Sequence, residues 1–272
     1  MPLLIKYFAH TNVPVEVEGL TPSAVREKSL VEIEKFTIFH GNRQLPLAEF
    51  FAVSGDASDG RIEFEGDLAG VHWIGAKMSE GEIRVAGPAG RHVGSEMSGG
   101  EIHVEGDCGD WLGAEMHGGL IHVRGRAGHL VGAAYRGSPR GMTRGAILVG
   151  GDAGDEVGRS MRRGLIAIGG SIGDFPAVNI IAGSVFAFGG CGIRPAAGMR
   201  RGTLALFGAQ TPALLPTFKL AGRCQPHFLR VYLRSLRKRG FRVPEELFDA
   251  DFLLYHGDLI ESQRGEILVC AA

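Results

Sequence analysis

The chain has 272 residues, of which 43 are glycine and 44 % are hydrophobic, and its formal net charge is −1. This apolar content supports a buried core and excludes a low-complexity disordered chain. The glycines form no collagen-type triplet, and no apolar run approaches the roughly 20 residues that a membrane span needs. The N-terminus lacks a signal-peptide pattern, and the four scattered cysteines include no C-x-x-C pair, so we expect a cytoplasmic protein.

Residues 1–55 predict a small β-rich segment. Alternating apolar residues mark three extended stretches, at 3–8, 13–17 and 30–39. Gly41 and Asn42 give a turn signal after the third stretch. We expect this segment to cover the N-terminal end of the structure that follows, because exposed strand edges must be protected.

Residues 56–210 contain an internal repeat that accounts for most of the glycine surplus. Units of 19 residues, with one insertion of two residues and one of seven, begin at Gly60, Gly81, Gly100, Gly119, Gly145, Gly164, Gly183 and Gly202. Each unit starts with two apolar residues around a polar one, which is typical of a short strand, and continues with G-x-x-G-x-x-x-G. The repeat predicts an all-β fold, a single-stranded parallel β-helix, expected to be right-handed, with about seven to eight coils.

The repeat register places equivalent residues in columns. All methionines after Met1 share one column, which we interpret as a flexible core filler and not as soft metal ligands. His103 and His122 are neighbours in an outward column, and two ligands fall short of the three or four that zinc needs. Cys108 and Cys191 share an inward column four coils apart, which excludes a disulfide between them. We therefore predict no metal site.

The seven-residue insertion, within residues 135–144, is the irregular feature of the repeat. A loop that protrudes from a regular stack is where function is commonly added. Arginines gather in this loop and in the coils near it, namely Arg136, Arg140, Arg144, Arg159, Arg162, Arg163, Arg200 and Arg201. Rows of guanidinium groups suit carboxylates or phosphates, so these residues are candidates for binding an anionic ligand, and an acidic partner subunit explains them equally well.

Residues 211–272 predict a C-terminal cap that contains a basic helix and a terminal strand. An apolar stripe lies between Pro226 and Gly240 and consists of Phe228, Leu229, Tyr232, Leu233 and Leu236. Basic residues occupy the other faces of this helix, whereas the first half of the chain is acidic. A membrane surface or a nucleic acid is an alternative partner, but we favour an end cap whose outer side meets an acidic neighbouring subunit.

The motifs of common enzyme classes are missing from the sequence. We find no G-x-S-x-G, Walker loop or H-E-x-x-H. Carboxylates such as Asp110, Asp155 and Asp174 are dispersed, whereas glycoside hydrolysis needs a pair on one face. We therefore expect no catalytic residue in this chain, with a carbohydrate-acting β-helix enzyme as the alternative.

The repeat and the tail together resemble a known family. The coils from Gly60 to Gly208, with Gly257-Asp-Leu259 and Arg264-Gly-Glu-Ile-Leu268, resemble the C subunit of formylmethanofuran dehydrogenase over nearly the whole chain. The coil motif alone also occurs in the C-terminal domain of the glutamate synthase large subunit, but the terminal segments argue against that relative. The basic helix and the stretch from Leu214 to Phe218 resemble the bacterial branch, the formyltransferase/hydrolase complex of methylotrophs. An archaeal-type C subunit is the alternative.

The resemblance implies a non-catalytic scaffold subunit of a cytoplasmic complex in tetrahydromethanopterin-linked one-carbon metabolism. The implied partners are a formyltransferase subunit, an amidohydrolase-like subunit and a molybdopterin-subunit homologue, with neither nucleic acid nor membrane involved. That complex converts a formyl group to formate through a methanofuran-type coenzyme. No cofactor held covalently or through a metal is implied for this chain, and the arginines would guide the anionic tail of the coenzyme.

Overall fold

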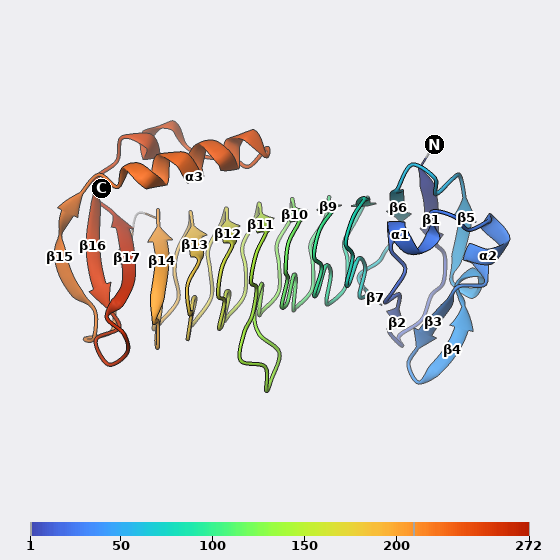
Figure 1. Cartoon of the computed structure of the whole chain (residues 1–272), viewed down its shortest axis with the longest axis horizontal. Helices are drawn as coiled ribbons and strands as arrows, with labels where there is room; N and C mark the ends of the chain where they lie inside the picture. Colours follow the sequence, from blue (N-terminus) through green and yellow to red (C-terminus); the bar gives the residue numbers. More distant parts are fainter. Residues whose placement is uncertain (1, 209, 272) are drawn as a thin grey trace.

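The computed structural model describes residues 2–208 and 210–271 and is an elongated stack of strands (Figure 1). Thirteen strands form one mixed sheet in the order β15-β16-β17-β14-β13-β12-β11-β10-β9-β8-β6-β1-β5, and four form a second sheet in the order β4-β3-β2-β7. The repeat contributes β6 (Arg61–Glu65), β8 (Glu82–Val85), β9 (Glu101–Val104), β10 (Leu120–Val123), β11 (Ala146–Val149), β12 (Leu165–Ile168), β13 (Ser184–Ala187) and β14 (Arg201–Leu206). The expectation of a β-rich fold is confirmed.

Successive repeat units stack in parallel with the register that the sequence predicts. Ile102 of β9 pairs with Ile83 on one side and with Ile121 on the other. Parallel single bridges form a second ladder, which joins Leu68, Ala89, Cys108, Ala127, Ala153, Ile172 and Cys191 in turn. Each unit therefore lies on the preceding one along two lines of backbone pairing, and we refer to each unit as a coil.

Apolar columns fill the interior of the coils. The methionine column is fully buried and consists of Met78, Met97, Met116, Met142, Met161 and Met199, with Ile180 in the remaining place. Neighbouring backbones approach so closely at the corners that side chains are excluded there. A Cβ atom built on Gly106 would lie 2.5 Å from the backbone nitrogen of Pro88 in the coil below. The glycine surplus thus reflects close packing of backbone on backbone.

The dispersed carboxylates Asp110, Asp155 and Asp174 connect neighbouring coils. Each accepts a hydrogen bond from the backbone N–H of a residue in the next coil. The N–H groups of His129, Asp174 and Ile193 donate to Asp110, Asp155 and Asp174, at 2.9, 2.8 and 3.0 Å respectively. These side chains therefore tie neighbouring coils together along one edge.

The N-terminal segment pairs with the first coil and contains short helices. β1 (Leu3–Tyr7) pairs in parallel with β6 and antiparallel with β5 (Phe51–Ser54). The second sheet consists of β2 (Val15–Glu16), β3 (Thr37–His40), β4 (Arg43–Pro46) and β7 (Val71–His72), and the helical turns are α1 (Pro22–Val25), α2 (Leu30–Glu34) and η1 (Leu47–Glu49).

The strand expected over residues 30–39 is wrong in its first half, which is the helix α2. Ser29 and Glu32 form a capping box, in which the Ser29 side chain accepts a bond from the N–H of Glu32 and the Glu32 carboxylate accepts one from the N–H of Ser29. This reciprocal pair satisfies donors that a helix N-terminus leaves free and so stabilises a helical turn. The strand β3 begins only at Thr37.

The C-terminal segment extends the large sheet by three strands. β17 (Arg264–Cys270) pairs in parallel with β14, and β16 (Phe252–Gly257) and β15 (Lys219–Cys224) follow antiparallel. These three strands form the C-terminal end of the molecule, and the short helix η2 (Glu245–Phe248) precedes β16. Within the described ranges, no helix is both long and apolar enough to cross a membrane.

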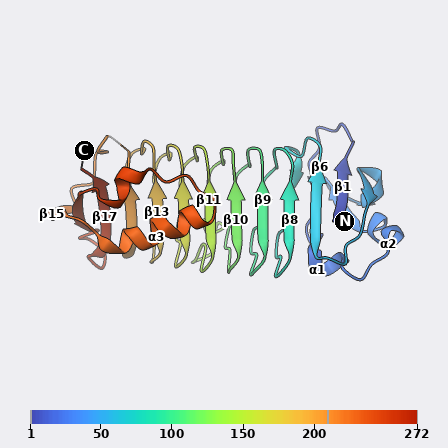
Figure 2. The same ribbon diagram turned by 90° about the horizontal axis from the view of Figure 1, so that it is seen from above.

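The basic helix α3 (His227–Lys238) lies along the sheet, whereas we expected it to cover the open end of the stack (Figure 2). Leu229, Leu233 and Leu236 are buried in one cluster with outward residues of the sheet that include Leu148 and Phe186. The sheet is apolar on this outer face from β11 onward, and that surface is what the helix covers. Phe228, which we placed in the apolar stripe of this helix, is 41 % exposed.

Candidate functional site

From the unit at Gly145 onward, one corner of the coils carries a column of arginines directly before the first glycine of the unit. Arg144 and Arg163 hold this position in successive coils. Ala182 interrupts the column, and Arg201 continues it. Arg201 is paired in register with Arg264 of β17, which we did not predict because it lies outside the repeat and 63 residues further along the chain. We call Arg144, Arg163, Arg201 and Arg264 the arginine column.

The arginine column is exposed and free of intramolecular ion pairs. All four side chains are exposed, and no carboxylate within residues 2–208 and 210–271 forms an ion pair with them. Arg162 and Arg200 form a second line beside it, two coils apart. Arg200 Nε lies 3.6 Å from Glu261 Oε2, whereas Arg162 is half-buried. Unpaired guanidinium groups along one edge form a surface that attracts anions.

The remaining predicted arginines lie elsewhere. Arg159 forms an ion pair with Glu156, with 2.6 Å between Nη1 and Oε2. Arg136 and Arg140 lie in the insertion, which leaves the stack after Ala134 and rejoins it at Gly141. Both of these flanking residues donate backbone hydrogen bonds to the next coil, so residues 135–140 form the protruding loop. The eight predicted arginines therefore belong to the column, to the second line, to the loop or to a separate ion pair.

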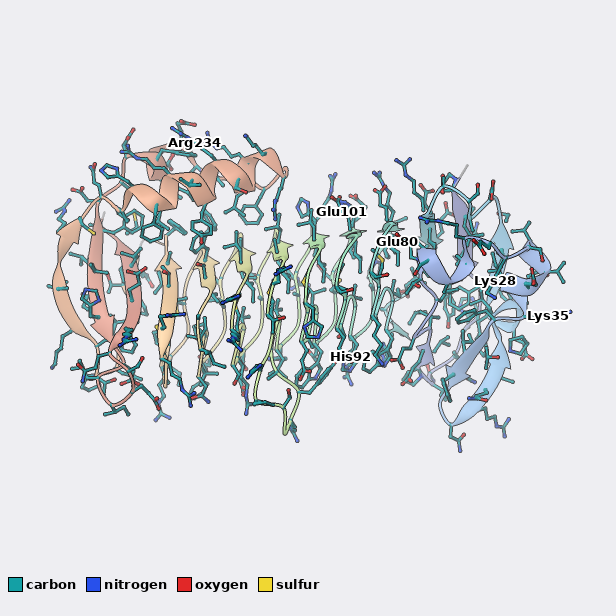
Figure 3. The ribbon with its side chains drawn as sticks, viewed as in Figure 1. Lys28, Lys35, Glu80, His92, Glu101 and Arg234 are labelled. Carbon is teal, nitrogen blue, oxygen red and sulfur yellow. The ribbon has the colours of Figure 1, made fainter. Side chains whose placement is uncertain are left out.

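The insertion loop is anchored on an aromatic stack that we did not predict. The Trp73 and His92 rings stack at 4.0 Å between centroids, and Trp111 lies parallel to His92 at 6.1 Å. Tyr135 packs on Trp111 at 4.9 Å. The signal was present in the sequence, because Trp73, His92 and Trp111 follow one another at the 19-residue period. Figure 3 shows His92 on the side of the coils away from α3.

A hydrogen bond joins this stack to the loop. Tyr135 Oη lies 2.9 Å from His92 Nδ1. Burial raises the pKa of Tyr135 to about 12, so the hydroxyl keeps its proton at neutral pH. Burial also lowers the pKa of His92 to about 4, so the ring is neutral as well and the bond joins a neutral imidazole to a neutral phenol. The loop is thus held by an uncharged contact.

The two outward histidines are neighbours, as the repeat predicts. His103 and His122 pair in register across β9 and β10, with 6.1 Å between ring centroids. His103 Nε2 lies 3.1 Å from Glu101 Oε2, and burial lowers the pKa of His122. Over residues 2–208 and 210–271, no group of three or more His, Cys, Asp or Glu side chains is arranged to hold a metal ion.

Sequence and structure comparisons relate the chain to components of one enzyme family. No protein-family model matches it. It is 38 % identical over 86 residues to the C subunit of the molybdenum-containing formylmethanofuran dehydrogenase 1 of Methanosarcina barkeri, which is 30 % of this chain and 29 % of that protein. It is 37 % identical over 85 residues to the C subunit of the tungsten-containing formylmethanofuran dehydrogenase 2 of Methanothermobacter wolfeii, which is 30 % of this chain and 32 % of that one. The match therefore spans about a third of these curated relatives.

A solved structure is similar over the full length. The chain is 33 % identical, with a TM-score of 0.91, to a chain in the crystal structure of the formyltransferase/hydrolase complex of Methylorubrum extorquens with methylofuran. The similarity covers 99 % of this chain and 100 % of that chain. The similarity therefore includes the terminal segments as well as the repeat. The chain belongs to the family of formylmethanofuran dehydrogenase C subunits.

Proposed function

We propose that this chain is the non-catalytic scaffold subunit of a formyltransferase/hydrolase complex. The observation that carries the proposal is the 33 % identity over 99 % of the chain to a component of such a complex. In this role, the stack provides a rigid edge on which larger subunits assemble. The exposed arginine column and the basic outer side of α3 supply polar surfaces for them.

The proposed partners are the catalytic subunits of the same cytoplasmic complex, namely a formyltransferase subunit, an amidohydrolase-like subunit and a molybdopterin-subunit homologue. Together they would transfer a formyl group from a tetrahydromethanopterin carrier to a methanofuran-type coenzyme and release formate. The methylofuran in the similar complex supports a coenzyme of this kind.

The architecture that supports this role is a parallel β-helix. Parallel pairing on two ladders, with the chain returning to the same position every 19 residues in most coils, favours that description. We assign residues 56–210 to the β-helix, residues 1–55 to an N-terminal segment and residues 211–272 to a C-terminal segment. A stack of this kind has little internal freedom, because every coil is hydrogen-bonded to both of its neighbours.

We also propose that the arginines guide an anionic part of the coenzyme. The fit rests on the exposed, unpaired side chains of Arg144 and Arg163 in adjacent coils, with Arg136 and Arg140 in the nearby loop. Charge-assisted bonds from guanidinium groups to carboxylates are directional and are often bidentate. Arg264 joins this set because it is the register partner of Arg201.

Affinity purification of the tagged chain from its native host tests the scaffold proposal. We expect it to purify with larger chains that carry the transferase and hydrolase activities. The isolated chain should hydrolyse no formyl-coenzyme. Recovery of the chain as a stable monomer with hydrolase activity of its own would contradict the proposal.

A further inference from the structure

The outer face of the large sheet changes from apolar to polar where α3 ends. One outward column passes through Arg84, His103 and His122 in β8 to β10 and continues as Leu148 and Ala167 in β11 and β12. Both apolar members belong to the buried cluster under α3. Because α3 ends at Lys238, the polar members are not buried beneath it: Arg84 is exposed, and His103 and His122 are half-buried. Figure 1 shows this end of α3 above the middle of the sheet.

A groove of about 670 Å³ opens at this boundary. The imidazoles of His103 and His122 and the guanidinium of Arg124 line it from the sheet, and Arg239 and Arg242 line it from the turn after α3. This volume lies within the range of small-molecule sites, roughly 300–1,000 Å³. The groove therefore brings basic groups from two distant segments of the chain to one place.

The turn that forms one wall is held firmly on the sheet. Phe241 is only 4 % exposed, and its ring centroid lies 5.4 Å from that of Phe188. Gly240 has a φ of +78°, and a Cβ built on it would lie 3.9 Å from His122 Cε1. Arg239 and Arg242 flank this anchored pair, so the backbone that carries both guanidinium groups is fixed beside the histidines.

The groove has more positive groups than carboxylates to balance them. Arg124 Nε lies 2.8 Å from Glu105 Oε2, and His103 is paired with Glu101. Arg84, the remaining charged group of the column, is paired with Glu82 of its own strand. Arg239 and Arg242 are exposed and form no ion pair within residues 2–208 and 210–271.

We propose that this groove binds a multiply charged oxyanion, the phosphate, sulfate or dicarboxylate group of a small molecule. Arg239 and Arg242 would donate charge-assisted hydrogen bonds from one wall. His103 and His122 would add positive charge from the floor when protonated. The groove lies at the carboxyl ends of β11 and β12, beside Gly150 and Gly169. Arg144 and Arg163 precede the same strands, and the insertion loop lies on the side of the stack away from α3 (Figure 1), so this site is separate from the proposed coenzyme contacts.

Calorimetric titration of the full chain with sulfate and with succinate tests the proposal. Saturable binding of either probe supports it, and the preferred probe separates tetrahedral from carboxylate ligands. Arg242→Gln should weaken binding by about tenfold, because it removes charge-assisted bonds. Arg234→Gln is the matched control, since it removes the same charge from the outer side of α3 and should change the affinity by less than about twofold (Figure 3).

A second variant and a pH series complete the test. Arg239→Gln should reproduce the loss if Arg242→Gln proves unstable. Sulfate keeps its double charge between about pH 7 and pH 5, a window that extends below the ordinary histidine pKa, so tighter binding at the lower pH reports protonation of the histidines. The charged groups that face them are Arg84, Glu101, Glu105, Arg124, Arg239 and Arg242. Replacement of His103 and His122 by Gln should remove that pH dependence. Absence of saturable binding of both probes, or an equal loss in Arg234→Gln, would overturn the proposal.

Discussion

Tyr135 and His92 lie 43 residues apart in the sequence and meet in a hydrogen bond of 2.9 Å between Oη and Nδ1. The bond attaches the seven-residue insertion of the repeat to a column of stacked rings. This contact lies on the side of the molecule away from α3 (Figure 3).

Tyr135→Phe should loosen the insertion loop. The substitution removes the hydroxyl but keeps the ring on Trp111, so the expected loss is about 1 kcal/mol of unfolding free energy, the usual worth of one hydrogen bond. Hydrogen exchange and limited proteolysis at residues 136–140 should both become faster. Tyr255→Phe, in β16 at the C-terminal end of the molecule, is the control and should leave the loop unchanged. If the loop of Tyr135→Phe exchanged like that of the wild type, the bond would not hold it.

The pH dependence of stability should report His92. Its pKa falls from 6.5 to about 4 because the folded state buries the neutral ring. Between about pH 6.5 and pH 4, the unfolded chain therefore binds a proton at His92 that the folded chain does not bind. The free energy of unfolding decreases as the pH falls through this range. We expect a contribution of about 1–2 kcal/mol, reduced from the full shift because the ring is only half-buried.

Denaturant titrations between neutral pH and about pH 4 measure this dependence. His92→Phe keeps a flat ring between the tryptophans and should flatten the slope relative to wild type. His227→Gln, an exposed histidine of α3, should leave the slope as it is. An unchanged slope in His92→Phe would show that other groups cause the acid sensitivity.

Close backbone contact should make one corner glycine far more sensitive to substitution than another. Gly106→Ala places a Cβ 2.5 Å from the backbone of the preceding coil, and we expect a loss of about 3 kcal/mol as the coils are forced apart. Gly70→Ala meets no atom within 4 Å and should change the stability by less than about 0.5 kcal/mol. Thermal unfolding of the two variants measures the difference. Equal effects would contradict the packing role of the corners.

Loss of two arginines of the column together with one of the insertion loop should weaken coenzyme retention without dissolving the complex. We expect Arg144→Ala, Arg163→Ala and Arg140→Ala together to lower the amount of methanofuran-type coenzyme that purifies with the assembled complex. Raising the salt concentration should weaken retention in the wild type, because exposed charges are screened. Mass spectrometry of the purified complex measures the retained coenzyme.

Arg223→Ala, together with Arg126→Ala, provides a control with charge removed away from the column, where both residues already have carboxylate partners. Retention in this control should equal that of the wild type. If the arginine variants also retained normal amounts of coenzyme, the column would serve only as a protein interface or a solvated edge.

The sequence predicts the local features of the fold well, because a fixed period transfers register from coil to coil. The methionine column, the His103–His122 pair and the Cys108–Cys191 column all follow from that period. The position of α3 does not, since it depends on two surfaces from distant segments. The apolar column that contains Leu148 and Phe186 indicated the surface that α3 covers. The sequence pattern does not show which helix packs there, because α3 starts 41 residues after Phe186.

The sequence also predicted part of the candidate site, because the repeat period fixes the register of the coils. Arg144, Arg163 and Arg201 share a column because the period places them there. Arg264 returns to that column only after the chain has passed through β15, α3 and β16, so its place is set by tertiary pairing. Helix α2 was missed although the Ser29–Glu32 capping box marks it, because the alternation of apolar residues around it favoured a strand.

The scaffold role is tested most directly by assembly with and without this chain. The proposed transferase and hydrolase subunits would be produced together, and the mass of their complexes measured by sedimentation. We predict one large complex that contains both activities when this chain is present, and separate transferase and hydrolase species when it is left out. A full-sized, active complex formed in its absence would contradict the scaffold role.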